Sequence, residues 1–200
     1  MIPLINPLEE CTLCPRNCKV NRLKDETGFC KANANIKLAR VSLHQWEEPC
    51  ISGQNGSGTI FFSNCNLNCV FCQNHKISQE DVGKEISSER LAEIFIEQQN
   101  KNAHNINLVT PTHYVPQIIE SITLAKEKGL KIPIVYNTNS YVNVNTIKSL
   151  DGLVDIYLAD LKYFDNKYSY KYSKVKNYFD FASKSIEEMY NQRSEEHTSE

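Results

Sequence analysis

The spacing of hydrophobic and polar residues divides the chain into two parts. Residues 1–57 have little periodicity and are typical of loops. From Gly58 onward, short apolar runs alternate with amphipathic stretches in which apolar residues recur every three or four positions. The runs predict strands at residues 59–63, 106–110, 132–136 and 154–159. The amphipathic stretches predict helices at residues 87–101, 115–128 and 142–150, with a further helix inside 167–192.

This alternation predicts an α/β fold. Each connection between successive strands is long enough for a helical crossover, so the strands should be parallel and belong to one sheet. A closed eight-fold barrel needs about 250 residues, so the four βα units seen here form only a partial barrel. We divide the chain into a Cys-rich N-terminal extension at 1–57, a βα core at 58–192 and a tail at 193–200.

The tail, residues 193–200, has the sequence RSEEHTSE. It matches the translation of a common sequencing-library adapter, and a chance match over the whole tail is very improbable. We therefore expect the tail to be an artefact, and the native chain to be interrupted near Gln192 with its C-terminal part missing.

Charge and composition exclude several classes of protein. The 22 Lys and Arg residues nearly balance 24 Asp and Glu residues, for a net charge of −2, which argues against nucleic-acid or membrane partners. No apolar run approaches the ~18 residues of a transmembrane helix, and the N-terminus lacks the basic start of a signal peptide. The hydrophobic fraction of 40% is enough for a globular core, so we expect a soluble cytoplasmic protein.

Cysteine content changes the picture most. All eight cysteines lie between Cys11 and Cys72, and in a reducing compartment such short spacings indicate metal ligands rather than disulfides. Cys65, Cys69 and Cys72 form C-x3-C-x2-C directly after the first predicted strand. Three thiolates can hold three corners of a 4Fe–4S cluster and leave one iron open. The alternatives are a zinc site completed by His75, or simply buried cysteines.

A second set of cysteines precedes the predicted core. The spacing C-x2-C-x3-C-x11-C can close a coordination sphere with four thiolates, so a structural zinc and a second 4Fe–4S cluster fit equally well. Cys50 is left over and is expected to be a small buried residue. The four cysteines of this set are Cys11, Cys14, Cys18 and Cys30.

Polar residues gather where the later predicted strands end. In parallel βα folds the carboxyl ends of the strands meet at one edge of the sheet, where active sites are built. A Lys there can bind a carboxylate, and an Asp or Asn can bind an ammonium group or ribose hydroxyls. The alternative is that surface ion pairs simply end the strands. The residues concerned are Thr110, Thr112, His113, Asn137, Asn139, Asp160 and Lys162.

The chain resembles the radical S-adenosylmethionine (SAM) superfamily, and within it proteins related to pyruvate formate-lyase activating enzymes. The resemblance extends over about residues 8–190 and is carried by CTLCPRNCKVNR, EPCISGQNGSGTIFFSNCNLNCVFCQN, NLVTPTHY, YNTNSY and DIYLADLKYFD. It implies a partial (βα)6 barrel and a 4Fe–4S cluster whose open iron is chelated by SAM. The reduced cluster would cleave SAM to methionine and a 5′-deoxyadenosyl radical, which abstracts a hydrogen from the substrate.

The resemblance also implies roles for single residues and partners. Phe71 matches the residue beside adenine, and Asp160 and Lys162 match a SAM-binding segment. Asn64 stands where relatives commonly have Gly, a mild departure because Asn tolerates positive φ. The usual Gly-Gly-Glu after the second strand is replaced by residues 110–113. The implied partners are SAM, an electron donor such as flavodoxin or ferredoxin, and as substrate a glycyl-radical enzyme, another protein or a metabolite.

Two other classes of function compete with this interpretation. A zinc-ribbon module for nucleic acid would use the N-terminal cysteines, but the basic residues near them are few. An iron–sulfur electron carrier would need less scaffold than four βα units. Iron content and cleavage of SAM distinguish the three.

Overall fold

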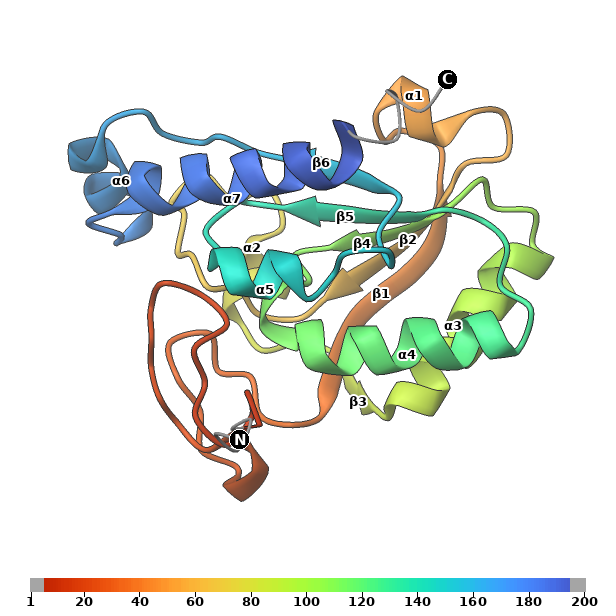
Figure 1. Ribbon diagram of the computed structural model, residues 1–200, viewed down its shortest axis with the longest axis horizontal. Coiled ribbons are helices and arrows are strands. Elements are labelled where there is room, and N and C mark those ends of the chain that lie inside the picture. The colour runs from red at the N-terminus through yellow and green to blue at the C-terminus, as the bar shows by residue number, and fades with distance from the viewer. Residues whose placement is uncertain (1–5, 195–200) are drawn as a thin grey trace.

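The computed structural model describes residues 6–194, and its centre is one six-stranded sheet in the order β3-β1-β2-β4-β5-β6 (Figure 1). Strands β2, β4, β5 and β6 pair in parallel, as expected from the long connections between them. The α/β fold with four parallel strands is therefore confirmed. Their bounds are Ser57–Phe62, Ile106–Val109, Ile134–Thr138 and Ile156–Ala159.

Two antiparallel strands extend the sheet beyond the predicted ones. Strand β1 (Ile36–His44) pairs with β2, and β3 (Lys84–Ile86) pairs with β1. The expectation that residues 1–57 are loop-like is therefore wrong for β1. Its register shifts between Leu38 and Arg40, so the apolar alternation changes phase in mid-strand and hides the period of two. The predicted domain boundary after residue 57 falls at the first residue of β2.

Three helices follow the predicted pattern closely. Helix α3 (Ser88–Asn100) begins where the Ser87 side chain accepts a hydrogen bond from the Arg90 N–H. Helices α4 (Val115–Glu127) and α5 (Val144–Lys148) follow β4 and β5. Gly129 has a φ of +91° just after α4, as expected of a residue that ends a helix.

The stretch 167–192 forms two helices rather than one. Helix α6 (Asn166–Ser173) ends at Lys174, whose φ of +57° is left-handed and turns the chain. Helix α7 (Tyr178–Ser194) then runs back along β6 and α5. Of the predicted tail, residues 195–200 lie outside the described residues. The remaining short helices are η1 (Arg22–Lys24), α1 (Pro49–Ser52), α2 (His75–Gln79) and η2 (Thr112–Tyr114).

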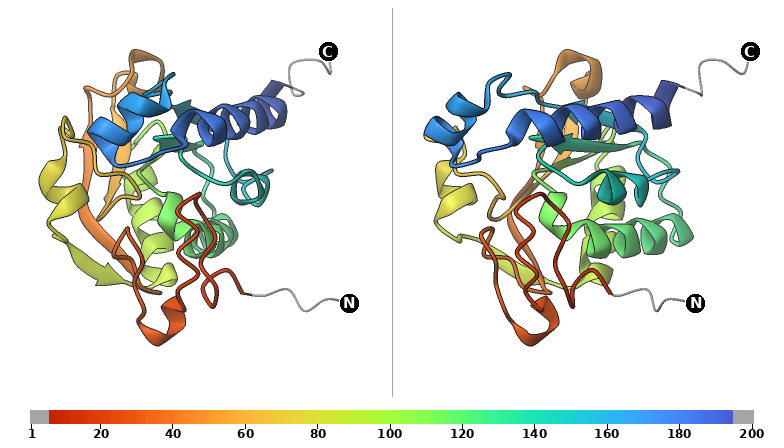
Figure 2. Two further views of the ribbon diagram at one scale, coloured as in Figure 1. Left: turned by 90° about the vertical axis from the view of Figure 1, so that its left-hand side faces the viewer. Right: turned by 60° about the vertical axis from the view of Figure 1, so that its left-hand side comes forward.

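The main core lies between the sheet and helices α3 and α4, and includes Ile60, Phe95, Leu108 and Ile118. Residues 6–34, called the N-terminal coil below, contain no strand and only the short helix η1. In Figure 2 this coil lies beside the segments that follow β4 and β5, and the Asn143 N–H donates to Leu13 O at 3.2 Å. Between residues 6 and 194, no helix is long and apolar enough to cross a membrane.

Candidate active site

The loop after β2, residues 64–72, carries three of the eight cysteines and is called the three-cysteine loop below. Cys69 is buried, whereas Cys65 and Cys72 are partly exposed. The loop leaves the strand at Asn64, which has a φ of +72° and donates to Asp81 Oδ1 at 2.9 Å. Asn thus takes the left-handed conformation for which Gly is the usual residue, as expected.

The three thiols lie within electrostatic reach of one another. The pKa of Cys65 is raised to about 12, mainly by burial and in part by the neighbouring Cys69 and Cys72, because thiolates repel. Burial likewise raises the pKa of Cys69. Without a cation Cys65 and Cys69 are neutral thiols near pH 7, whereas a bound metal removes the protons of its thiol ligands outright.

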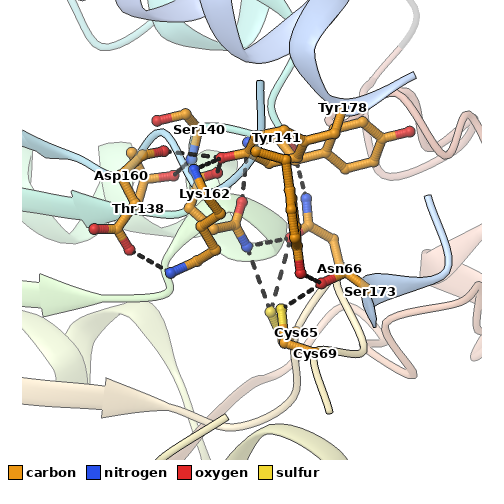
Figure 3. Close-up of polar contacts among 12 residues, drawn as sticks. Cys65, Asn66, Cys69, Thr138, Ser140, Tyr141, Asp160, Lys162, Ser173 and Tyr178 are labelled. Carbon is orange, nitrogen blue, oxygen red and sulfur yellow. Dashed lines mark hydrogen bonds and ion pairs between the residues drawn. The ribbon is translucent and has the colours of Figure 1, made fainter. Parts of the chain in front are cut away.

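Hydrogen-bond donors surround the sulfurs (Figure 3). Ser173 Oγ donates to Cys69 Sγ at 2.8 Å, and Asn139 Nδ2 donates to Cys65 Sγ at 3.5 Å. The backbone N–H of Leu67 donates to Cys65 Sγ at 3.4 Å. Donors of this kind stabilise a thiolate and tune the reduction potential of an iron–sulfur cluster.

The cysteines do not form a ready-made site for a single ion. Within residues 6–194, no three Cys, His, Asp or Glu side chains come together as ligands around one metal do. A tetrahedral zinc with Zn–S bonds of about 2.3 Å needs such convergence. His75, the expected fourth zinc ligand, instead lies 3.5 Å from Glu80.

A cleft of about 600 Å³ opens beside the three-cysteine loop. This volume is typical of sites for small molecules and cofactors. Its walls combine the loop, the carboxyl ends of β4, β5 and β6, and the segment after β1. They include Cys65, Cys69, Phe71, Cys72, Thr110, Asn137, Asn139, Asp160, Lys162 and, after β1, Trp46 and Glu47.

Most of the polar residues expected at the strand ends meet in this cleft, but two do not. Thr112 is buried beneath it and accepts a hydrogen bond from Tyr136 OH at 3.2 Å. His113 is buried, and its Nε2 lies 2.8 Å from Ser63 O. Burial lowers the pKa of His113 to about 3, so the ring is neutral and Nε2–H donates to that carbonyl. Both residues lie in η2, and neither lines the cleft.

Two features of the cleft wall affect how a ligand would bind. Lys162 Nζ lies 2.6 Å from Asp160 Oδ2, so the two residues pair with each other (Figure 3). Thr110 has a φ of +58°, a conformation that strains a β-branched residue. It occupies the start of the segment that replaces Gly-Gly-Glu.

The N-terminal cysteines line a different, much smaller cavity of about 20 Å³. The pKa of Cys14 is raised to about 12, mainly by burial and in part by Cys30 and Cys11. Cys50, expected to be buried, is instead exposed in α1 and lies outside both sets.

Several residues that organise these sites were not found by sequence reasoning. Arg16 lies between two cysteines in CPRNC, and Asn66 lies inside the three-cysteine loop, yet neither was singled out as a link. Arg16 Nε donates to Asn66 O at 3.0 Å and thus joins the two regions. Tyr178 is buried and donates to Asn139 O at 2.7 Å. Only the positions of Arg16 and Asn66 within the cysteine motifs gave a usable signal.

Sequence comparisons give matches to a family and to individual proteins. The profile described as the Radical SAM superfamily matches residues 59–197. An uncharacterized protein of Methanocaldococcus jannaschii is 35% identical over 188 residues, which are 90% of this chain and 53% of that protein. A second uncharacterized protein of the same organism is 26% identical over 169 residues, covering 76% and 49% of the two chains. The chain thus spans about half the length of these curated relatives.

Proposed function

The chain belongs to the radical SAM superfamily, and on this premise we propose that it cleaves SAM reductively with a 4Fe–4S cluster held by Cys65, Cys69 and Cys72. When bound, this cluster supplies the electron that converts SAM to methionine and a 5′-deoxyadenosyl radical. The observation that carries the proposal is the meeting of three mutually interacting thiols with a 600 Å³ cleft at the carboxyl ends of parallel strands.

The chain's own residues suit these ligands. Three thiolates leave one corner of a cubane free, and Ser173 and Asn139 donate hydrogen bonds to the sulfurs that would hold the other corners. Proton loss from the buried thiols would accompany cluster assembly.

Binding of SAM is assigned to the side chains around the cleft. Lys162 would bind the carboxylate of SAM, and Asp160, released from its ion pair, would bind the ammonium group or ribose hydroxyls. Asn137 and Asn139 offer further donors and acceptors from β5 and its following loop, and Thr110 lies at the end of β4. Phe71, which packs edge-on against Tyr163 with ring centroids 6.1 Å apart, would flank the adenine.

The proposal extends to the class of substrate. The resemblance to pyruvate formate-lyase activating enzymes favours hydrogen abstraction from a glycine of a partner protein, with modification of another protein or a metabolite as the alternative. Trp46 on the cleft wall is 89% exposed, which suits contact with a macromolecular surface.

The proposal is tested by SAM cleavage under anaerobic conditions. The reconstituted chain is reduced with dithionite, and 5′-deoxyadenosine and methionine are measured by mass spectrometry. We expect both products from the wild type and from Cys50→Ser, which alters an exposed cysteine outside both sets. The Cys65→Ser/Cys69→Ser/Cys72→Ser variant should form neither. Cleavage by the triple variant would overturn the assignment, and a colourless, zinc-containing wild type would favour the zinc-module alternative.

A further inference from the structure

The four cysteines of the N-terminal coil line a single cavity although they span twenty residues of sequence. Backbone hydrogen bonds bring them together. The Cys11 N–H donates to Val20 O at 3.1 Å, and the Asn17 N–H donates to Cys14 O at 3.0 Å. The Phe29 N–H points to Cys18 Sγ at 3.5 Å. The coil therefore folds around its cysteines, in a segment with almost no regular secondary structure.

The surroundings of this cavity lack a negative charge. Arg16 and Arg22 both line it, and Arg22 is only 1% exposed. Within residues 6–194, neither arginine forms an ion pair with a carboxylate. Their donors instead bond backbone carbonyls, such as His113 O and Asn66 O. A buried cation without a counter-charge is costly, and four thiolates around a metal centre would supply a net charge of about −2.

A second unpartnered polar group belongs to a residue of the same cavity. His113 is among the lining residues, and its Nδ1 is buried with no hydrogen-bond partner among the described residues. Because Nε2–H donates to Ser63 O, Nδ1 carries a free lone pair. Unpaired buried acceptors are uncommon in native structures, so this one also points to a missing occupant of the cavity.

The pattern of cysteines favours iron and sulfide over zinc. Zinc sites of this kind usually join two close pairs of ligands, whereas Cys30 has no close partner in sequence. Iron–sulfur proteins hold their clusters with four Cys thiolates, and sets of three close cysteines with a distant fourth occur among them.

The cavity adjoins the three-cysteine loop through one side chain. Asn66 lines the cavity together with Cys14. Its side chain accepts a hydrogen bond from Cys65 Sγ at 3.9 Å and another from Asn139 Nδ2 at 2.9 Å. Asn66 therefore lies between the cavity and the three-cysteine loop.

We propose that Cys11, Cys14, Cys18 and Cys30 hold a second 4Fe–4S cluster, closed by four thiolates, which passes electrons to the three-cysteine site across Asn66. In each transfer the second cluster is oxidised by one electron and the open cluster is reduced by one. A low-potential one-electron donor, dithionite in the experiment, then reduces the second cluster again. The transfer step rests on the proposed function, whereas the presence of the second cluster does not.

Metal content separates the two sites. Iron, sulfide and zinc are measured in the full chain after anaerobic reconstitution, with Cys50→Ser as the matched control. We expect about eight irons in the wild type and the control, and about four in both the triple variant of the three-cysteine loop and a Cys14→Ser/Cys18→Ser variant. In Gly28→Ala the new Cβ would lie 2.7 Å from Cys18 Sγ, so this variant should also lose about four irons without removing a ligand.

The electron path is tested by paramagnetic resonance of the reduced chain. Two neighbouring reduced clusters broaden each other's signals, and this broadening should be present in the wild type and absent from both single-cluster variants. One zinc and no iron in the triple variant would overturn the second cluster, and so would a metal-free triple variant that keeps the wild-type circular dichroism. Two clusters without magnetic interaction would overturn the transfer step alone. Failure of the wild type to cleave SAM, with iron retained in the triple variant, would overturn the proposed function and leave the second cluster standing.

Discussion

The two cysteine sets of this chain differ in what surrounds them. The three-cysteine loop opens into a cleft of about 600 Å³ walled by polar strand ends, whereas the N-terminal set lines a cavity of about 20 Å³ with two buried or half-buried arginines. Three ligands beside open space suit a centre that binds a further molecule, and four ligands around a closed space suit a centre that does not. The number of cysteines and the volume of the adjoining space thus lead to the same conclusion: the three-cysteine loop binds a further molecule and the N-terminal set does not.

The largest expected difference is in thiol reactivity, between Cys65 and Cys14, whose thiol groups are desolvated, and the exposed Cys50. With pKa values near 12, Cys65 and Cys14 hold about a thousandfold less thiolate at pH 8 than a thiol of ordinary pKa. In metal-free protein we expect iodoacetamide to modify Cys50 first and these two far more slowly, as followed by peptide mass spectrometry. Because the folded pKa is raised, the neutral thiols stabilise the fold below about pH 9, and this stability is lost as pH rises toward 12. Equal rates at all three cysteines would show that the sets are not buried in solution.

The next largest effect is expected on the free energy of unfolding, when Arg16, which links the two cysteine sets, is replaced. The Arg16 guanidinium donates to Asn66 O at 3.0 Å and to Lys174 O at 2.9 Å, and it lies 3.5 Å from the centre of the Phe29 ring. Arg16→Met should lower the free energy of unfolding by about 3 kcal/mol, because charged hydrogen bonds contribute about 1.5–3 kcal/mol each. Arg16→Lys keeps the charge but not the fork of donors, and should recover only part of the loss. Anaerobic urea denaturation measures the free energy of unfolding of both variants. An Arg16→Met variant as stable as the wild type would mean that the N-terminal coil and the three-cysteine loop do not stabilise each other through Arg16.

Backbone strain is expected at the open site. Thr110 holds a left-handed φ of +58° on the wall of the cleft. Thr110→Gly should raise the free energy of unfolding by about 1 kcal/mol, since relief of strain of about 1–3 kcal/mol exceeds the added entropy of the unfolded chain. Thr110→Ala keeps most of the strain and serves as the control. If thermal denaturation finds glycine less stable than alanine, the strain does not exist.

The smallest effect should be a change in the reduction potential of the three-cysteine cluster alone. Ser173→Ala removes the 2.8 Å hydrogen bond to Cys69 Sγ. A hydrogen bond of about 1 kcal/mol corresponds to roughly 40 mV for one electron, and its loss disfavours the more negative reduced state. The potential of the three-cysteine cluster should therefore fall by about 40 mV in a redox titration. Ser183→Ala, whose hydroxyl donates only to Phe179 O, is the matched control and should leave both potentials unchanged.

The features that could be predicted from the sequence are those that a local pattern of residues encodes. Apolar periodicity located the four parallel strands, and cysteine spacing defined both sets. Strand β1 was hidden because its bulge reverses the alternation. The direction of η2 depends on packing, so the departure of Thr112 and His113 from the cleft had no signal in the sequence. The contacts of Arg16 with Asn66 and Lys174 join residues far apart in the chain, and no local pattern encodes them.

The difference between an open and a closed centre can be measured by adding SAM to the reduced protein and recording its paramagnetic resonance spectrum. If the three-cysteine loop holds a cluster with one iron free of protein ligands, SAM should change the signal of that cluster in the wild type and in Cys50→Ser. The same addition should leave the spectrum of the Cys65→Ser/Cys69→Ser/Cys72→Ser variant unchanged, because its remaining cluster is closed by four thiolates. A wild-type spectrum that ignores SAM despite a full complement of iron, or an equal change in the triple variant, would contradict the assignment of the open site.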